Sequence, residues 1–203
     1  MLFRSGLDFS IPHRMFQENF WNCVRKEKGA ILSVSKNIGH RLFAGMMVDA
    51  DATQTPIEAE KFVGVRLDMD LVEGQETAIG KTVALYTDRN PAQELDEAWE
   101  KGMSLLKTSA RKYEEVLECN HAFWANFWEK SDITIDGDED TQQGIRFCIF
   151  QMQQTYRGAI DGANIGAKGL TGEAYNGNAF WDTETYCLPF YLFSNPTAAK
   201  SLI

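Results

Sequence analysis

The spacing of apolar residues changes at Asn90-Pro91, and this change constrains the fold of the 203-residue chain more than any other feature. Before this point, apolar residues recur mostly at alternate positions, as in strands of a sheet with one buried and one solvated face. After it, they recur at intervals of three and four, as on one face of a helix. The sequence therefore predicts a β portion followed by an α portion.

Four strands are predicted before Asn90. The third alternates most clearly, because charged residues separate Val65, Leu67 and Met69. Glu73-Gly74-Gln75 is expected to form a hairpin turn between the last two strands. The predicted strands are Ala30–Lys36, Arg41–Ala50, Lys61–Leu71 and Thr77–Asp88.

Two helices are predicted after Asn90, at Pro91–Ser109 and Tyr113–Lys130. Asn90 is suited to cap the first helix, Pro91 to its first position, and Gln93 to the partner position of a capping box. An apolar, aromatic stripe runs along both helices, and we interpret it as core packing. Its members are Leu95, Trp99, Met103, Leu106, Ala110, Tyr113, Leu117, Trp124 and Trp128.

Shorter elements are predicted after the second helix. The acidic loop Asp136–Asp140 lacks the glycine and the final glutamate of a calcium-binding EF-hand loop, since Thr141 and Phe147 occupy those positions. We interpret it as the solvated start of the next helix, where acidic residues favour the positive end of the helix dipole. The predicted elements are a strand at Ile133–Ile135, a helix at Thr141–Tyr156, a helix at Asp182–Phe193 that is interrupted or ended near Pro189, and a helix opened by Asn195-Pro196.

Composition excludes several classes of partner. Acidic residues outnumber basic ones by 29 to 20, and the formal net charge of -9 opposes binding to nucleic acid or to an anionic membrane surface. The sequence contains no run of about 18 apolar residues, so no transmembrane helix is expected. Charges at Arg4, Asp8 and Glu18 interrupt any signal-peptide core, so a cytoplasmic location is expected.

The four scattered cysteines, Cys23, Cys119, Cys148 and Cys187, show no metal or redox spacing and are interpreted as buried, reduced thiols.

Residues 157–181 contain six glycines and show no clear period. Neither phosphate-loop spacing fits them, and the element before them is predicted to be a helix. The stretch ends at Phe180-Trp181-Asp182, where an indole and a carboxylate could stack on and hydrogen-bond to a sugar. A Trp-Asp pair at a helix start is more often a packing residue followed by an N-cap, and no pair of carboxylates with the separation of a glycosidase acid and base is evident.

Four motifs carry a family resemblance: Ile145-Arg-Phe147, Ala167-Lys-Gly-Leu-Thr-Gly-Glu173, Phe180-Trp-Asp-Thr-Glu184 and Leu188-Pro-Phe190. With them the chain resembles glycoside hydrolase family 65, which contains maltose, kojibiose, nigerose, trehalose and glucosylglycerol phosphorylases and has acid trehalases as relatives. Arg41–Gly45 extends the resemblance more loosely into the strand region.

The resemblance implies a multidomain β + α fragment. Residues 1–89 would be the C-terminal part of an antiparallel N-terminal β-sandwich domain, and residues 90–131 a helical linker. Residues 132–203 would be the first helices of an (α/α)6 barrel, the catalytic domain of this family. The chain is therefore expected to be an interior segment of a longer enzyme.

The resemblance also implies an inverting phosphorylase. A glutamate protonates the leaving oxygen of an α-linked disaccharide or glucoside, while inorganic phosphate attacks from the opposite face and yields β-glucose 1-phosphate. Phosphate is the co-substrate, and no cofactor or metal is implied. The general acid and the phosphate-binding residues are expected beyond Ile203, so no catalytic residue is assigned here and the chain alone is expected to be inactive. Family members are often homodimers.

Trp181 and Asp182 match family residues that contact glucose in subsite -1, and they are the substrate-binding residues that the resemblance assigns. Lys168, Thr171 and Glu173 match the motif and are assigned to loop architecture, whereas Asn178 stands where many members carry His. Two alternatives remain: a fragment of a trehalase-like hydrolase of the same family, and a non-catalytic sugar-binding module. The last is disfavoured because the predicted strands and helices would leave edges and apolar faces uncovered.

Overall fold

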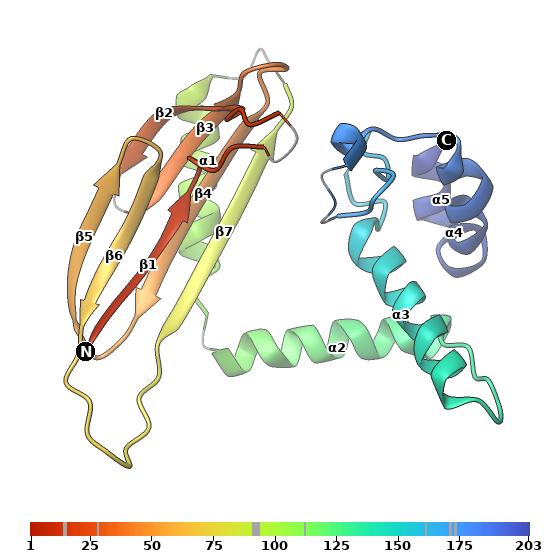
Figure 1. Ribbon diagram of the computed structural model, residues 1–203. Helices are drawn as coiled ribbons and strands as arrows, with labels where there is room; N and C mark the ends of the chain where they lie inside the picture. The colour runs from red at the N-terminus through yellow and green to blue at the C-terminus, as the bar shows by residue number, and fades with distance from the viewer. Residues whose placement is uncertain are drawn as a thin grey trace. The chain divides into compact units, whose positions relative to one another are not determined.

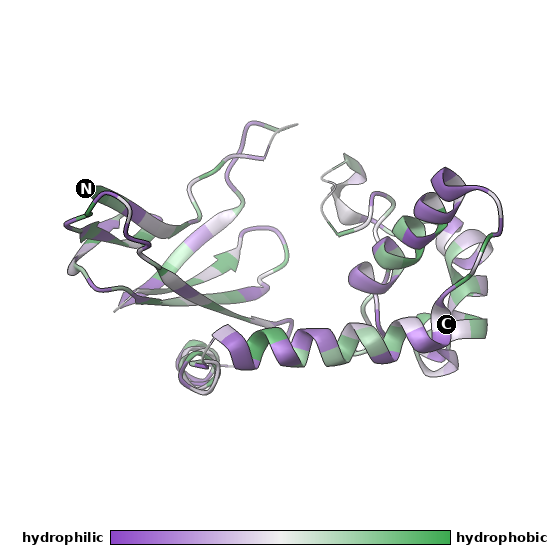
Figure 2. Cartoon of the chain, turned by 90° about the horizontal axis from the view of Figure 1, so that it is seen from below, coloured by the Kyte–Doolittle hydropathy of each residue, from purple (hydrophilic) through white to green (hydrophobic). Residues whose placement is uncertain are grey.

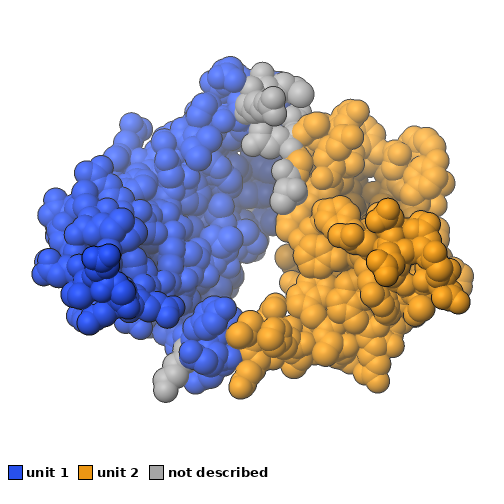
Figure 3. All heavy atoms as spheres, turned by 60° about the horizontal axis from the view of Figure 1, so that its bottom comes forward, with its two compact units in different colours: residues 1–116 blue, residues 117–203 orange. Residues whose placement is uncertain are grey.

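The computed structural model describes residues 1–13, 16–27, 29–90, 94–111, 113–160, 162–170, 172 and 174–203. The chain forms two compact units, Met1–Val116 and Leu117–Ile203, which Figure 3 shows in different colours. No helix among the described residues is both long enough and apolar enough to cross a bilayer.

Unit 1 contains two antiparallel sheets (Figure 1). The three-stranded sheet has the order β1-β6-β5, and the four-stranded sheet has the order β2-β3-β4-β7. The described residues thus confirm an antiparallel β-sandwich as the N-terminal part of the fold. The strands are β1 (Leu2–Asp8), β2 (Trp21–Glu27), β3 (Ala30–Ser35), β4 (Arg41–Asp49), β5 (Thr53–Ala59), β6 (Phe62–Asp68) and β7 (Gly80–Asp88).

The four-stranded sheet packs on both faces. Ile31 and Ala44 contact Val63 of the opposite sheet in one core cluster. Ala30, Leu32 and Phe43 turn to the other face and contact helix α1 (Leu95–Thr108), chiefly through Trp99 and Leu106. The Phe43 and Trp99 rings meet edge to face, with centroids 5.4 Å apart. Strands β3 and β4 therefore carry apolar residues on both sides, which weakens the alternation expected of a sheet with a single buried face.

Two predicted details of unit 1 are wrong. The turn at Glu73-Gly74 forms, with Gly74 at φ +80°, but it does not close a hairpin, because β6 and β7 belong to different sheets. The described part of α1 begins at Leu95 with Glu94 as N-cap, so Asn90 is not the cap. The Asn90 N–H instead donates to Asp88 Oδ1 at 2.7 Å, while Pro91 and Gln93 lie outside the described residues.

Unit 2 is helical. Helix α2 (Tyr113–Ser131) runs into it from unit 1, followed by α3 (Glu139–Thr155), a 3₁₀ turn (Ala174–Gly177), a π-helical segment (Thr183–Cys187), α4 (Leu188–Ser194) and α5 (Pro196–Leu202). The predicted helix starts at the acidic loop and at Asn195 are confirmed, and a side chain caps each helix. Asp138 Oδ1 accepts from the Thr141 N–H at 3.0 Å, and Asn195 Oδ1 accepts from the Ala198 N–H at 3.1 Å. The unit's core joins Tyr156, Ile165, Tyr191, Ala198 and Ala199.

The core interpretation of the aromatic stripe holds for part of α1, where Leu95 is nevertheless exposed, and fails for α2. Trp99 and Leu106 are buried, whereas Tyr113 is 74 % exposed and no residue of α2 is buried. Hydrophobic and hydrophilic residues are interspersed along this long helix (Figure 2). Its aromatic side chains pack mainly on one another, and Trp124 contacts Phe150 of α3 with ring centroids 5.0 Å apart.

Two further predictions about unit 2 need correction. Ile133–Ile135 forms no strand. Its backbone groups bond to the side chain of Gln142 instead of to a neighbouring strand: the side chain accepts from the Ile135 N–H at 2.7 Å and donates to the Ile133 carbonyl at 2.8 Å. Among the described residues no disulfide joins the cysteines, but the prediction that they are buried is wrong, because Cys119 and Cys148 are exposed and Cys23 and Cys187 are only partly buried.

Candidate functional site

Trp181 and Asp182 lie where the glycine-rich stretch enters the π-helical segment. The indole of Trp181 is 67 % exposed, and its ring centroid lies 6.2 Å from that of Tyr186. Asp182 is at the N-cap position, yet its exposed carboxylate makes no capping hydrogen bond. Neither side chain therefore has the structural role, buried packing or helix capping, that was the alternative to ligand binding.

Backbone hydrogen bonds fix the path of the chain through this pair. The Thr183 N–H donates to the Phe180 carbonyl at 3.0 Å, and the Thr185 N–H donates to the Trp181 carbonyl at 3.1 Å. The hydroxyl of Thr183, which is only 4 % exposed, donates to the Ile165 carbonyl at 3.3 Å. Thr183 thus links the π-helical segment to Ile165 within the glycine-rich stretch, a contact between residues that are 18 positions apart in sequence.

A π-helical turn follows directly and ends just before Pro189. Proline has no N–H, so the Thr185 carbonyl lacks the partner that an α-helix would supply from position 189. The Leu188 N–H reaches back to the Thr183 carbonyl, five residues earlier. The predicted interruption near Pro189 therefore takes the form of a wider turn, a feature that often occurs at functional sites.

The glycine-rich stretch folds back on itself and on α5. A Cβ at Gly158, where φ is +69°, would lie 2.6 Å from Ala198 Cα, and a Cβ at Gly172 would lie 2.3 Å from the Cβ of Lys168. The Lys168 ammonium lies 5.6 Å from the centroid of the Tyr175 ring. Asn178 accepts from the Ala167 N–H through its carbonyl at 3.2 Å. Thr171 and Glu173 lie outside the described residues.

Burial raises the pKa values of two groups that follow Trp181 and Asp182 in the sequence, the Cys187 thiol and the Tyr191 hydroxyl. The pKa of the Cys187 thiol is raised by burial and further by the negative charges of Asp182 and Glu184, so this sulfur stays protonated at neutral pH. Burial also raises the pKa of the Tyr191 hydroxyl, which donates to the Met152 carbonyl at 2.7 Å. Across the described residues, no group of three or more His, Cys, Asp and Glu side chains could hold a metal ion.

Comparison with known proteins identifies the family. Residues 1–127 match the N-terminal domain of glycosyl hydrolase family 65, and residues 146–203 match the central catalytic domain of the same family. The chain belongs to glycosyl hydrolase family 65. Maltose phosphorylase of Bacillus subtilis (strain 168) is a family 65 relative that is 33 % identical over 199 residues, which cover 93 % of this chain and 26 % of that protein.

Other relatives extend the comparison. Alpha,alpha-trehalose phosphorylase of Geobacillus stearothermophilus is 35 % identical over 157 residues, covering 77 % of this chain and 20 % of that protein. A solved structure from the human microbiome, of a protein assigned as a kojibiose phosphorylase, superimposes with a TM-score of 0.90 and 37 % sequence identity. It covers 99 % of this chain and 27 % of that one. The family 65 chain described here thus spans 26 % of the length of maltose phosphorylase and 20 % of the trehalose phosphorylase.

Proposed function

We propose that these residues belong to an inverting disaccharide phosphorylase that converts an α-linked glucoside and inorganic phosphate to β-glucose 1-phosphate. The similarity of the whole chain to a protein assigned as a kojibiose phosphorylase carries the proposal. Relatives with the same reaction type in their names, maltose and trehalose phosphorylases, support it. In such an enzyme phosphate is the nucleophile, so no general base and no cofactor is required.

Trp181 and Asp182 are the proposed contacts to glucose. The exposed indole offers a flat apolar face to the C–H face of a pyranose, and the uncommitted carboxylate can accept hydrogen bonds from two sugar hydroxyls. The Thr183–Ile165 hydrogen bond and the adjoining π-turn hold the backbone beneath both residues. A ligand would therefore meet side chains whose main chain is already in place, which lowers the entropic cost of binding.

The proton donor is proposed to come from outside these 203 residues. Residues 132–203 are proposed to form the first helices of an (α/α)6 barrel, with residues 1–89 as part of the sandwich and 90–131 as the linker. The complete enzyme is proposed to be cytoplasmic and homodimeric. On this proposal the 203-residue chain retains part of a glucose pocket and is catalytically silent.

Two measurements on the purified chain test the proposal. The first is product formation from maltose, kojibiose, nigerose and trehalose, with and without phosphate. We expect no glucose 1-phosphate and no glucose. Phosphate-dependent turnover would show that the chain carries its own general acid, and glucose release without phosphate would favour the trehalase-like alternative.

The second measurement is the indole ¹H–¹⁵N signal of Trp181 during titration with glucose or a disaccharide. The signal should shift saturably, and Asp182→Asn should abolish the shift, because the amide cannot accept the same hydrogen bonds as the carboxylate. Glu139→Gln, which neutralises an exposed carboxylate at the start of α3, is the matched control. An unchanged Trp181 signal at saturating sugar would count against the assigned pocket.

A further inference from the structure

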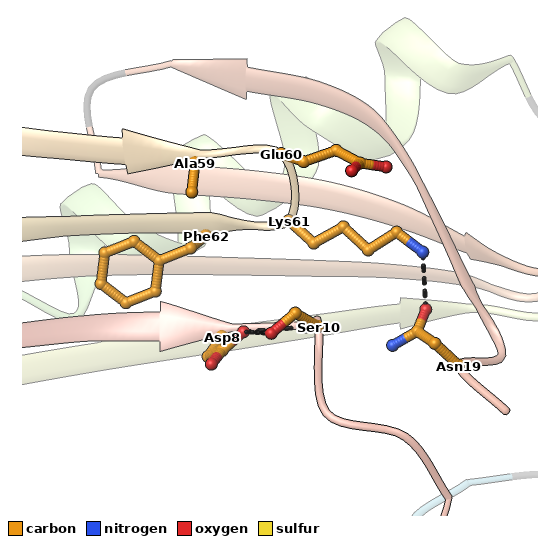
Figure 4. Close-up of a pocket in the computed structure, with 7 residues that line it drawn as sticks. All are labelled: Asp8, Ser10, Asn19, Ala59, Glu60, Lys61 and Phe62. Atoms are coloured by element: carbon orange, nitrogen blue, oxygen red, sulfur yellow. Dashed lines mark hydrogen bonds between the residues drawn. The ribbon is translucent and has the colours of Figure 1, made fainter. Parts of the chain in front are cut away.

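A hollow at one end of the three-stranded sheet in unit 1 has no role in the proposed phosphorolysis. It has a volume of about 480 Å³ and opens to solvent. Volumes of roughly 300–1,000 Å³ are typical of small-molecule sites. It lies where β1 ends, where β5 turns into β6, and where the chain approaches β2, and its lining residues are Asp8, Ser10, Asn19, Ala59, Glu60, Lys61 and Phe62 (Figure 4).

Asn19 holds these segments together through all four hydrogen bonds that an amide can make. Its Nδ2 donates to the carbonyls of Phe9 at 2.5 Å and Ile11 at 3.1 Å. Its Oδ1 accepts from the Trp21 N–H at 3.1 Å and from Lys61 Nζ at 2.7 Å. Lys61 Nζ also donates to the Trp21 carbonyl at 2.7 Å. The floor of the hollow is therefore formed before any ligand arrives, and binding would not have to order it.

The charged groups on this floor retain unused hydrogen-bonding capacity. Ser10 donates its N–H and its hydroxyl to Asp8 Oδ1, at 2.8 and 2.6 Å. These bonds lower the pKa of Asp8 and leave Oδ2 without a partner among the described residues. The Glu60 carboxylate is exposed and takes part in none of the ion pairs between residues that the structure describes. An ammonium has three N–H donors, and the two bonds made by Lys61 leave one for a ligand.

Phe62 supplies an apolar wall. Its ring lies over the cross-strand pair Gly6 and Gly64, since a Cβ at these glycines would come within 2.2 Å and 2.6 Å of the ring. Side chains at either position would displace the ring, so the two glycines fix its place on the sheet. The hollow combines one aromatic ring with two carboxylates and one ammonium.

This combination selects among ligand classes. Two carboxylates and one ammonium leave a net negative site, which repels phosphate and other anions. Two carboxylates alone do not complete a metal site, and no group of three or more ligating side chains occurs in the described parts of the chain. A pyranose fits the remaining features, because its hydroxyls donate to carboxylates, accept from an ammonium, and leave an apolar face for an aromatic ring.

We infer that the hollow formed by Asp8, Glu60, Lys61 and Phe62 is a binding site for a neutral pyranose. It lies in unit 1, whereas Trp181 and Asp182 lie in unit 2, so the inference does not depend on the proposed phosphorolysis. Its role would be to bind sugar without reacting with it.

The test is a ¹H–¹⁵N titration of the 203-residue chain with glucose, maltose and trehalose. Saturable shifts should appear at Ser10, the Asn19 side-chain amide and Lys61. Asp8→Asn and Glu60→Gln should each weaken binding at these signals about tenfold, as expected when a hydrogen bond to a charged group is lost. Glu76→Gln, which neutralises an exposed carboxylate outside the hollow, should leave the affinity unchanged.

Several outcomes would overturn the inference. They are the absence of saturable shifts at the hollow, equal affinity in the two hollow variants and the parent chain, and saturable binding of spermidine or inorganic phosphate in place of sugar. The spectra also report folding, so a variant that unfolds is recognised, and Phe62→Leu then provides a further test through the aromatic wall. Trp181→Ala separates the two proposals, because it should remove sugar shifts in unit 2 and leave those at the hollow intact.

Discussion

Replacing Gly102 by Ala tests the packing between α1 and the four-stranded sheet. A Cβ at this buried position would lie 2.2, 2.4 and 2.6 Å from three ring atoms of Phe43. The ring cannot withdraw easily, because Phe43 is fully buried and packs edge to face on Trp99. Overpacking a filled core costs about 1–3 kcal/mol, and approaches this short belong at the upper end or above it.

Helix propensity acts in the opposite direction. Alanine in a helix interior is favoured over glycine by roughly 1 kcal/mol, so the net expectation for Gly102→Ala is a loss of about 2 kcal/mol. Gly144→Ala in α3 is the matched control, since nothing lies within 4 Å of a Cβ there. The control should gain about 0.5–1 kcal/mol from propensity alone.

Urea denaturation combined with hydrogen exchange would measure both effects. Exchange should accelerate in β4 and α1 of the Gly102 variant and slow in α3 of the Gly144 variant, so each change is assigned to its own unit. If Gly102→Ala stabilised the chain as Gly144→Ala does, Phe43 could not occupy the space beneath Gly102, and the described packing of α1 would be wrong.

Three other expectations follow from individual contacts. Gln142→Leu should destabilise unit 2 by about 1–3 kcal/mol in urea, because it removes two side-chain bonds to the backbone at Ile133 and Ile135, whereas Gln143→Leu on the exposed face should change little. Hydrogen bonds from Thr141 lower the pKa of Asp138 in the folded chain. The stabilisation that the Asp138 carboxylate provides is therefore complete above its unfolded-state pKa of about 4 and is lost as the pH falls through the lower folded-state pKa. In acid titrations followed by circular dichroism, the Asp138→Asn variant should lack this pH-dependent part of the stability. Thiol labelling at pH 8 should modify the exposed Cys119 and Cys148 first and Cys187 slowly, because the pKa of Cys187 is raised, and equal rates in single-cysteine variants would contradict this order.

The strands that the sequence predicts are those that contain buried apolar residues, whereas the missed strands β1, β2 and β5 contain none. Strands β3, β4, β6 and β7 contain Leu32, Phe43, Leu67 and Ala84, and their predicted positions agree with the structure to within a few residues. Strand β5, with the sequence Thr-Gln-Thr-Pro-Ile-Glu-Ala, has no buried residue and contains a proline. Its strand conformation depends on backbone pairing with the adjacent strand β6, which the periodicity of its own side chains does not report.

The same limit applies to the candidate sites. Trp181 and Asp182 could be found because they are adjacent in a recognisable motif. The Thr183–Ile165 hydrogen bond could not be foreseen, because it crosses the glycine-rich stretch and depends on how that stretch folds. The hollow near Lys61 was also missed, since residues 8 and 61 come together only through the pairing of β1 with β6, and Asn19 joins them through hydrogen bonds of its side chain. The one local signal was an asparagine directly before two aromatic residues, Asn19 before Phe20 and Trp21.

The open edge of β1 shows how a sheet with this topology is protected. The Phe9 N–H donates to the Lys61 carbonyl and the Met69 N–H donates to the Met1 carbonyl, so odd-numbered residues of β1 form the hydrogen-bonded pairs with β6. Even-numbered residues therefore turn their backbone groups away from β6.

One of these outward groups, the Gly6 carbonyl, accepts from Lys81 Nζ at 3.1 Å. Lys81 belongs to β7, whose neighbouring side chains Val83 and Leu85 are 42 % and 61 % exposed. An apolar strand beside an unpaired edge is a template for association, and a lysine placed on that edge opposes it, because an incoming strand would have to displace and desolvate the ammonium. The charge at Lys81 therefore favours the separate sandwich over edge-to-edge pairing.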